Sequence, residues 1–226
     1  MSIRTPPATR TLTCRAVLFD MDGTLVDSTA VVEQVWTEFA VRYALDLAEI
    51  LRTSHGVQAG DTVRRFAPAG ADVVALTEEL GAMERVRTEG IVALPGAAEL
   101  LQNLPADAVA LVTSADRILA DVRMAAAGLA MPATAVTADL VTRGKPHPEG
   151  YLTAAGLLGV EPADAVVFED APAGIAAGLA AGIRTVAVGP NTGPLPDGVL
   201  HIPDYSSVSA SVETAAEGHR VISFRL

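Results

Sequence analysis

The chain has 226 residues, of which half are hydrophobic, and it carries a net charge of −11 at pH 7. A chain of this length buries one core, or one core and a small second module. The acidic balance argues against nucleic acid or an anionic membrane as a partner, and Cys14, as the single cysteine, excludes an internal disulfide. Because the sequence shows no signal-peptide layout and no apolar run of about 18 residues, we expect a cytoplasmic monomer.

The N-terminal part of the chain leads into the first chemical motif. Residues 1–13 are mostly polar and include Pro6 and Pro7, and we expect residues 1–14 to form a loose arm. The apolar run Val17-Leu18-Phe19 is typical of a strand buried on both faces of a parallel sheet, and it ends at Asp20. Ligands bind at the carboxyl ends of such strands. Asp22 follows, and Gly23 favours a tight turn, so both carboxylates are predicted to face one site.

The next segment is predicted to be entirely helical. Apolar residues recur at helical spacing from Val31 to Tyr43, and Asp27 or Ser28 can cap this helix. The segment ends at Leu94-Pro95-Gly96, which stops a helix. We therefore interpret residues 27–94 as an inserted all-helical cap domain, with helices at about 27–44, 46–52, 61–66 and 72–89.

From residue 95 onward, short apolar strands alternate with helices. This alternation predicts an α/β core with a doubly wound (Rossmann-like) parallel sheet, formed by residues 15–26 and 95–226. Gly174, Gly178 and Gly182 are spaced along one helix face, which indicates close packing of that helix on the sheet. Besides the strand at 17–19, we expect strands at 109–112, 135–137, 165–168, 184–188 and 199–202.

Further polar residues follow the predicted strands. Thr113 and Ser114 come after the strand at 109–112, where a hydroxyl and the first amides of the next helix suit a phosphate, although either residue could simply cap that helix. Glu169 and Asp170 end the strand at 165–168, and Asp170 could likewise be a helix cap.

Lys145 is the only lysine among 16 basic residues. A site that needs only positive charge would accept arginine, so this position indicates a need for a compact ammonium group. Its neighbours Gly144 and Pro146 place it in a constrained loop.

Taken together, these strand-end residues resemble the four motifs of the haloacid dehalogenase-like hydrolases. The resemblance extends from Arg15 to about Val188. Two stretches, residues 144–149 and 168–175, are similar to the small-sugar and polyol phosphatases of that family, such as glycerol-3-phosphatase and 2-deoxyglucose-6-phosphatase. The residues that carry the match are Asp20, Asp22, Thr113, Lys145, Glu169 and Asp170.

The resemblance implies a Mg²⁺-dependent phosphomonoester hydrolase acting on a small sugar or polyol phosphate. It implies that Asp20 is the nucleophile, which forms an aspartyl-phosphate, and that Asp22 is the acid and base. Lys145 would neutralise charge and bind phosphate together with Thr113 and Ser114. The implied ligands of Mg²⁺ are Asp20, the backbone carbonyl of Asp22, Asp170, and Glu169 directly or through water.

Two alternatives stay open. A β-phosphoglucomutase-like enzyme has a similar cap and motifs, but it grips a second phosphate through a cap arginine. Ala59 occupies that position here, and Arg64 or Arg65 could replace it. The other alternative is a non-catalytic sensor of a phosphorylated ligand on the same fold.

Substrate choice is expected to lie in the cap, because the core motifs contact only the phosphate. His55, Gln58 and Asp61 are polar residues in the loop expected to face the site, and we take them as candidate specificity contacts.

Overall fold

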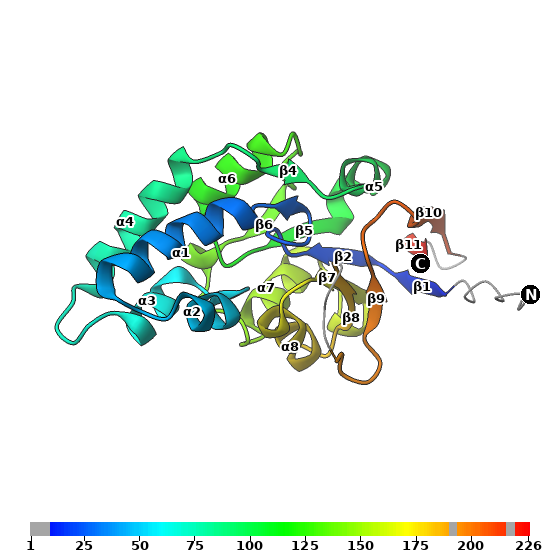
Figure 1. Cartoon of the computed structure of the whole chain (residues 1–226). Helices are drawn as coiled ribbons and strands as arrows, with labels where there is room; N and C mark the ends of the chain where they lie inside the picture. Colours follow the sequence, from blue (N-terminus) through cyan, green and yellow to red (C-terminus); the bar gives the residue numbers. More distant parts are fainter. Residues whose placement is uncertain (1–9, 190–193, 216–219) are drawn as a thin grey trace, which may run out of the picture.

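The computed structural model describes residues 10–189, 194–215 and 220–226. Its centre is a parallel sheet, drawn in Figure 1. This sheet has six strands. In spatial order the strands are β6 (Thr134–Val136), β5 (Val109–Val112), β2 (Ala16–Phe19), β7 (Ala165–Glu169), β8 (Arg184–Val188) and β9 (Leu200–Ile202). The predicted α/β class and doubly wound sheet are confirmed, and each expected strand lies within one residue of its predicted bounds.

Helices cover both faces of this sheet because the side chains of β2 alternate between two apolar clusters. Val17 and Phe19 pack with α5 (Ala97–Asn103) and α6 (Arg117–Ala126), whereas Leu18 packs with α7 (Glu149–Leu157) and α8 (Pro172–Ala180). All residues of β2, β5 and β7 are buried, as expected for central strands. Short 3₁₀ helices lie at η1 (Ala106–Ala108), η2 (Ala138–Leu140) and η3 (Pro162–Asp164).

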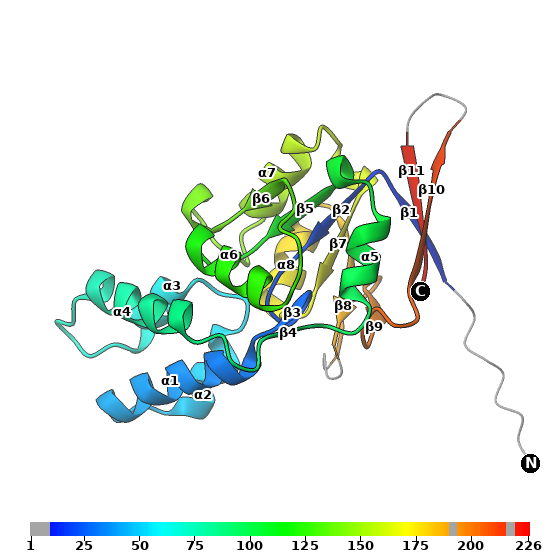
Figure 2. The same cartoon turned by 90° about the horizontal axis from the view of Figure 1, so that it is seen from above.

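A separate group of helices lies at one end of the molecule, seen from above in Figure 2. They are α1 (Thr29–Tyr43), α2 (Leu47–Ser54), α3 (Ala59–Phe66) and α4 (Val73–Val86), within three residues of the predicted bounds. Asp46 and Asp72 cap α2 and α4 by accepting from the Glu49 and Ala75 amides, at 3.2 and 3.0 Å. The four helices share their own apolar cluster, which includes Trp36. We propose that they form the cap expected at residues 27–94.

Two short strands connect this helical group to the core. β3 (Val26–Asp27) and β4 (Val92–Ala93) pair antiparallel, so the chain enters and leaves the helical group at neighbouring points. None of the helices in the described ranges is long and apolar enough to cross a membrane.

The expectation of a loose N-terminal arm is wrong for its last residues. Residues 1–9 lie outside the described ranges, but β1 (Thr11–Cys14) pairs with β11 (Arg220–Arg225), which also pairs with β10 (Ser209–Thr214). The three strands form an antiparallel sheet at the end of the molecule opposite the helical group (Figure 1). Leu12 and Cys14 alternate with exposed residues in β1. A four-residue strand whose partner lies at the other end of the chain has little local signal.

The glycine prediction holds for two of its three positions. A Cβ at Gly174 would lie 1.5 Å from Glu169 Oε1, and one at Gly178 would lie 2.6 Å from Thr185 Oγ1, so α8 packs tightly here. Gly182 does not belong to this face, because α8 ends at Ala180 and Gly182 has a φ of +73° in the following turn. At that position glycine provides left-handed backbone rather than close packing.

Candidate active site

The predicted motifs meet at the carboxyl ends of three adjacent strands. Asp20 follows β2, Thr113 follows β5, and Glu169 is the last residue of β7. The sheet continues for one residue past two of these strands: the Asp20 amide donates to the Phe168 carbonyl and the Thr113 amide to the Val136 carbonyl, both at 3.0 Å. The nucleophile and phosphate positions of the sequence analysis are therefore held by the rigid edge of the sheet.

Lys145 lies at the centre of the site, in the loop before α7. Its ammonium group donates to Asp20 Oδ1, to Glu169 Oε1 at 2.6 Å and to the Val112 carbonyl at 3.1 Å. Burial opposes the charged form, but the carboxylates of Asp20 and Glu169 outweigh it and raise the pKa of Lys145. The three protons of the ammonium group thus meet three acceptors.

Glu169 is fully buried and held on both oxygens. Oε1 accepts from Lys145 and from the Tyr151 hydroxyl at 3.0 Å, and Oε2 accepts from the Ala171 amide at 2.9 Å. Burial raises the pKa of Glu169, while Lys145 counteracts this shift. The absence of a side chain at Gly174 leaves the space that this carboxylate occupies.

Three carboxylates form a cluster that fits a hard divalent cation. One oxygen from each of Asp20, Glu169 and Asp170 lies within 4.8 Å of the others, and oxygen is the donor that Mg²⁺ prefers. Burial raises the pKa of Asp20 well above its ordinary value, and the carboxylates of Glu169 and Asp170 add to this although Lys145 opposes it. A bound cation would relieve the remaining repulsion.

Asp170 also contacts the helical group. Its Oδ1 accepts from the Thr24 hydroxyl at 3.3 Å, and its Oδ2 lies 2.6 Å from His55 Nε2. The hydrogen bond to Asp170 raises the pKa of His55 to about 9. Asp170 does not cap α8, whose N-cap is Ala171, so the alternative reading of Asp170 is wrong.

The carboxylate of Asp22 is bound by two further side chains. Its Oδ1 accepts from the Ser28 hydroxyl at 2.6 Å, and its Oδ2 accepts from Arg123 Nη1 at 2.7 Å. Arg123 also pairs with Glu84 of α4, at 3.2 Å. Ser28 precedes α1 as its N-cap residue, but its hydroxyl makes no capping bond. The sequence analysis missed Arg123 and Glu84.

Thr113 and Ser114 have different surroundings. Thr113 is buried, and its hydroxyl oxygen accepts from the Ala115 amide at 3.1 Å. The Ser114 hydroxyl instead donates to the Gly56 carbonyl, at 2.8 Å. Asp116 is the N-cap of α6 and accepts from the Leu119 amide at 2.9 Å. The reading of Thr113 or Ser114 as the helix cap is therefore wrong.

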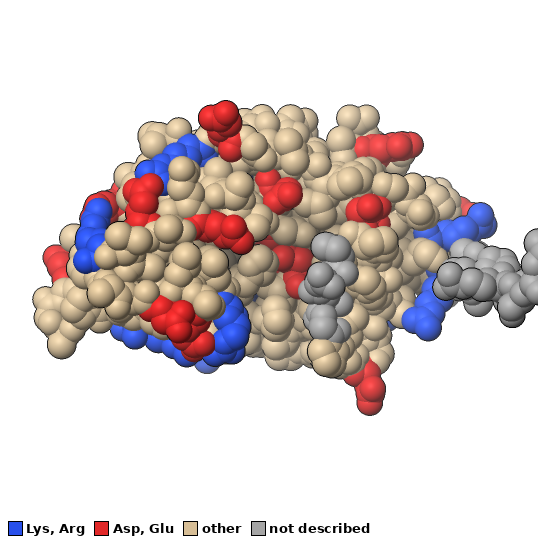
Figure 3. Space-filling model, in the orientation of Figure 1, with Lys and Arg blue, Asp and Glu red and all other residues tan. Residues whose placement is uncertain are grey.

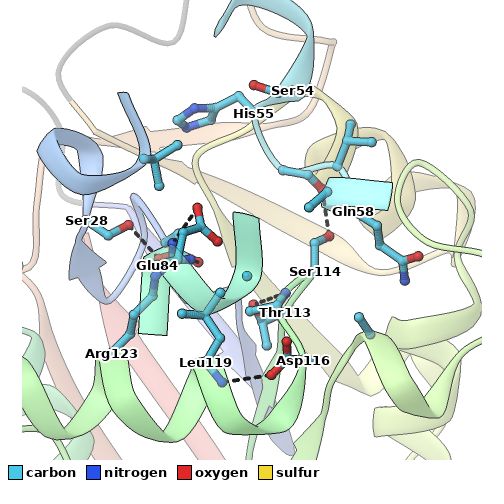
Figure 4. A pocket seen from close by; sticks show the side chains of 18 of the residues that line it. Ser28, Ser54, His55, Gln58, Glu84, Thr113, Ser114, Asp116, Leu119 and Arg123 are labelled. Carbon is cyan, nitrogen blue, oxygen red and sulfur yellow. Dashed lines mark hydrogen bonds and ion pairs between the residues drawn. The ribbon is translucent and has the colours of Figure 1, made fainter. Parts of the chain in front are cut away.

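A cavity of about 430 Å³ lies between the strand ends and the helical group. Figure 4 shows Ser28, Glu84 and Arg123 together on one side of it and Gln58, Thr113 and Ser114 on the other. His55 and Gln58 line the cavity as predicted. Asp61 is a correction: it is not among the lining residues. Asp61 lies in the first turn of α3, and its half-exposed carboxylate pairs with Arg64 at 2.5 Å.

The loop between α2 and α3 rests directly on the core. A Cβ at Gly56 would lie 2.6 Å from that of Ala171, and one at Gly144 would lie 2.9 Å from Gln58. Together with the His55–Asp170 and Ser114–Gly56 contacts, the loop thus touches the core at Ser114, Gly144, Asp170 and Ala171.

Comparison with known proteins shows the family to which the chain belongs. The model of the haloacid dehalogenase-like hydrolase family matches residues 14–182. Hexitol phosphatase A of Escherichia coli is 46% identical over 179 residues, which cover 77% of this chain and 83% of the relative. Glycerol-1-phosphate phosphohydrolase 1 of Saccharomyces cerevisiae is 35% identical over 199 residues, which cover 83% of this chain and 79% of the relative.

Among solved structures, the β-phosphoglucomutase of Clostridium difficile superposes with a TM-score of 0.74 and covers 85% of this chain and 92% of its own. It is 22% identical, a likeness that shows the shared fold alone. The family match and the two curated relatives carry the assignment. This chain belongs to the haloacid dehalogenase-like hydrolase family.

Proposed function

We propose that this protein is a Mg²⁺-dependent phosphomonoester hydrolase that acts on a small sugar or polyol phosphate through an aspartyl-phosphate. The observation that carries the proposal is the position of Asp20 at the end of β2, bound by Lys145 and beside two further carboxylates. The relatives named above are phosphatases of a hexitol phosphate and of glycerol 1-phosphate.

Asp20 is the nucleophile in this proposal. A carboxylate attacks phosphorus without first losing a proton, provided that positive charge offsets the repulsion between the two anions. Lys145 supplies part of that charge through Asp20 Oδ1, which leaves Oδ2 to attack in line. The Thr113 oxygen accepts from a backbone amide, so its own hydrogen is available to a phosphoryl oxygen.

Asp22 is the acid and base. Its Oδ2 faces the guanidinium of Arg123, a group that only donates, so a transferable proton belongs on Oδ1. The neighbouring Ser28 hydroxyl either donates or accepts, and it therefore tolerates both protonation states of Oδ1. Oδ1 gives its proton to the leaving alkoxide and then takes one from the water that attacks the aspartyl-phosphate. Such general acid and base catalysis typically accelerates a reaction about 10² to 10⁴-fold.

Asp20 and Asp170 would hold Mg²⁺, with Glu169 beside them directly or through water. The family resemblance adds the backbone carbonyl of Asp22 as a further ligand. When bound, the ion supplies positive charge to the phosphoryl oxygens. Positive charge inside the site is needed to attract a phosphorylated substrate. Acidic side chains are spread over the face drawn in Figure 3, and the arginines of that face lie mostly near its edges. With a net charge of −11, the whole chain repels a phosphorylated substrate.

The cavity favours a substrate with a single phosphate. Both arginines that line it are already paired: Arg85 with Asp116 and Glu78, each at 2.8 Å, and Arg123 with Asp22 and Glu84. Among the described lining residues, then, each arginine already pairs with two carboxylates and no lysine is present, which disfavours a second phosphate. The carboxylates present suit the hydroxyl groups of a sugar or polyol.

The two arginines considered for a phosphomutase do not line the cavity. Arg64 pairs with Asp61 at 2.5 Å, and Arg65 pairs with Glu49 at 3.0 Å. These contacts favour a hydrolase over a mutase. His55 and Gln58 are our proposed contacts to the substrate from the cap side.

The test is an assay of phosphate release from a panel of hexitol, glycerol and hexose monophosphates, with and without Mg²⁺. We expect turnover of one or more members, reversible loss of activity in EDTA, and no turnover by Asp20→Asn. Full activity of metal-free protein would contradict the metal assignment. Inactivity of the wild-type protein on the whole panel, or near-normal kcat of Asp20→Asn, would contradict the proposed function.

A further inference from the structure

A buried guanidinium joins the proposed acid and base to the helical group. We propose that Arg123 is a positioning residue: it fixes the carboxylate of Asp22 for proton transfer and, through Glu84, makes that position depend on the seating of α4. The inference rests on the proposed function, because it concerns the step that Asp22 performs.

The geometry restrains the carboxylate from two directions. Arg123, on the inner face of α6, binds Oδ2 at 2.7 Å, and Ser28, at the start of α1, binds Oδ1 at 2.6 Å. A carboxylate held on one oxygen still rotates about its Cβ–Cγ bond, whereas one held on both oxygens from different elements does not. Arg123 is the charged one of these two restraints, because a guanidinium keeps its proton throughout the ordinary pH range.

Packing alone does not explain this arginine. Arg123 is 4% exposed and occupies the same buried face of α6 as Leu119 and Met124. Burying a guanidinium is unfavourable until it is paired, and replacing a buried ion pair by apolar side chains is often neutral or stabilising. Neither its Nε nor its Nη2 has a hydrogen-bond partner among the described residues, and Nη2 meets Glu84 only as an ion pair at 3.2 Å, so the network is not a fully satisfied structural one.

Glu84 connects this restraint to the helical group. It is 9% exposed, lies on α4, and is 3.2 Å from Arg123 Nη2. The next residue of α4, Arg85, pairs with Asp116 at the start of α6, at 2.8 Å. Two adjacent residues of α4 are thus bound to α6, and displacement of α4 would take away the second carboxylate that orients Arg123.

The experiment measures the single-turnover rate at which the leaving group is released, and it compares two substrates with different leaving groups. The variants are Arg123→Met and Arg123→Lys, with Arg117→Met as a matched control. Arg117 lies on the same helix, its side chain is 53% exposed, and among the described residues its guanidinium pairs only with Asp121. The substrates are the best alkyl phosphate of the panel, whose leaving oxygen needs a proton, and p-nitrophenyl phosphate, which leaves without one.

We expect Arg123→Met to slow release from the alkyl phosphate at least about tenfold more than release from p-nitrophenyl phosphate, because proton transfer contributes about 10² to 10⁴-fold. Arg123→Lys should recover part of this loss, Glu84→Gln should show the same selectivity to a smaller extent, and Arg117→Met should resemble wild type. Equal losses on both substrates, or no loss, would overturn the proposal.

A double variant distinguishes a positioning role of Arg123 from a general structural role. In Asp22→Asn protein, Arg123→Met should change release of the alkyl product little further, whereas a structural role would reduce the rate again by its full factor. If Arg123→Met does not fold, Arg123→Lys and Glu84→Gln carry the same comparison. If wild type is active and Asp22→Asn is impaired but the Arg123 variants are not, this inference fails while the proposed function stands.

Discussion

At the scale of single residues, Lys145 is the clearest case of a charge that must be compact. Its ammonium group donates to two carboxylates and one carbonyl in a position that is 6% exposed. A guanidinium is larger and planar, so it would displace one of these acceptors. Lys145→Arg should therefore lower kcat about as much as Lys145→Met, on the order of 10²-fold or more.

Steady-state kcat on the best substrate measures this prediction, and circular dichroism confirms that each variant is folded. Arg143→Gln is the control, since Arg143 lies in the same loop, its side chain is 66% exposed, and its guanidinium makes a surface ion pair with Glu149. It should change kcat little. A Lys145→Arg enzyme with most of its kcat would show that charge alone suffices at this position.

At the scale of elements, the loop between α2 and α3 decides how the helical group meets the core. Gly56 has a φ of +73° and lies against Ala171, whereas Gly70 has a φ of +84° with nothing within 4 Å of an added Cβ. Alanine at either position should cost about 1–2 kcal/mol of stability, since both need left-handed backbone. Only Gly56→Ala should also push the loop off the core and lower kcat/KM, about tenfold or more.

The comparison uses thermal unfolding and kcat/KM on the same substrate. Gly70→Ala lies in the loop between α3 and α4, so it reproduces the backbone strain without the contact. Equal kcat/KM for the two variants would mean that contact between the loop and Ala171 does not matter for turnover.

At the scale of the whole molecule, the antiparallel sheet of β1, β11 and β10 packs on the core, although the family match ends at residue 182. Phe224 of β11 is fully buried, and its ring lies 5.4 Å from that of Phe168, in the strand that ends at Glu169. Phe224→Ala should lower the free energy of unfolding by about 3–5 kcal/mol, as for other large cavities in a core.

Denaturant unfolding measures this loss, with Val212→Ala as the control in the neighbouring strand β10. Val212 is 41% exposed, so its truncation should change the free energy of unfolding by about 0.5 kcal/mol or less. If Phe224→Ala were as mild as Val212→Ala, the antiparallel sheet would be an appendage rather than a part of the core.

The sequence by itself determined the parallel sheet and the polar strand ends. A strand buried on both faces is a continuous apolar run, and a carboxylate or hydroxyl directly after it has to lie at the sheet edge. This local rule located Asp20, Thr113, Glu169 and Asp170, and the lysine count singled out Lys145. The helical group was equally predictable, because periodicity and capping residues are local properties of the chain.

Only the tertiary structure decided which distant groups complete the site. Arg123 is 101 residues from Asp22. Its position on the buried face of α6 indicates that this arginine is unusual, but it does not indicate which residue pairs with it. The same holds for the Ser114 contact with Gly56 and for the pairing of β1 with β11. Periodicity reports that a face is buried, but the partner against which it is buried depends on how the elements pack, and no local pattern of residues encodes that.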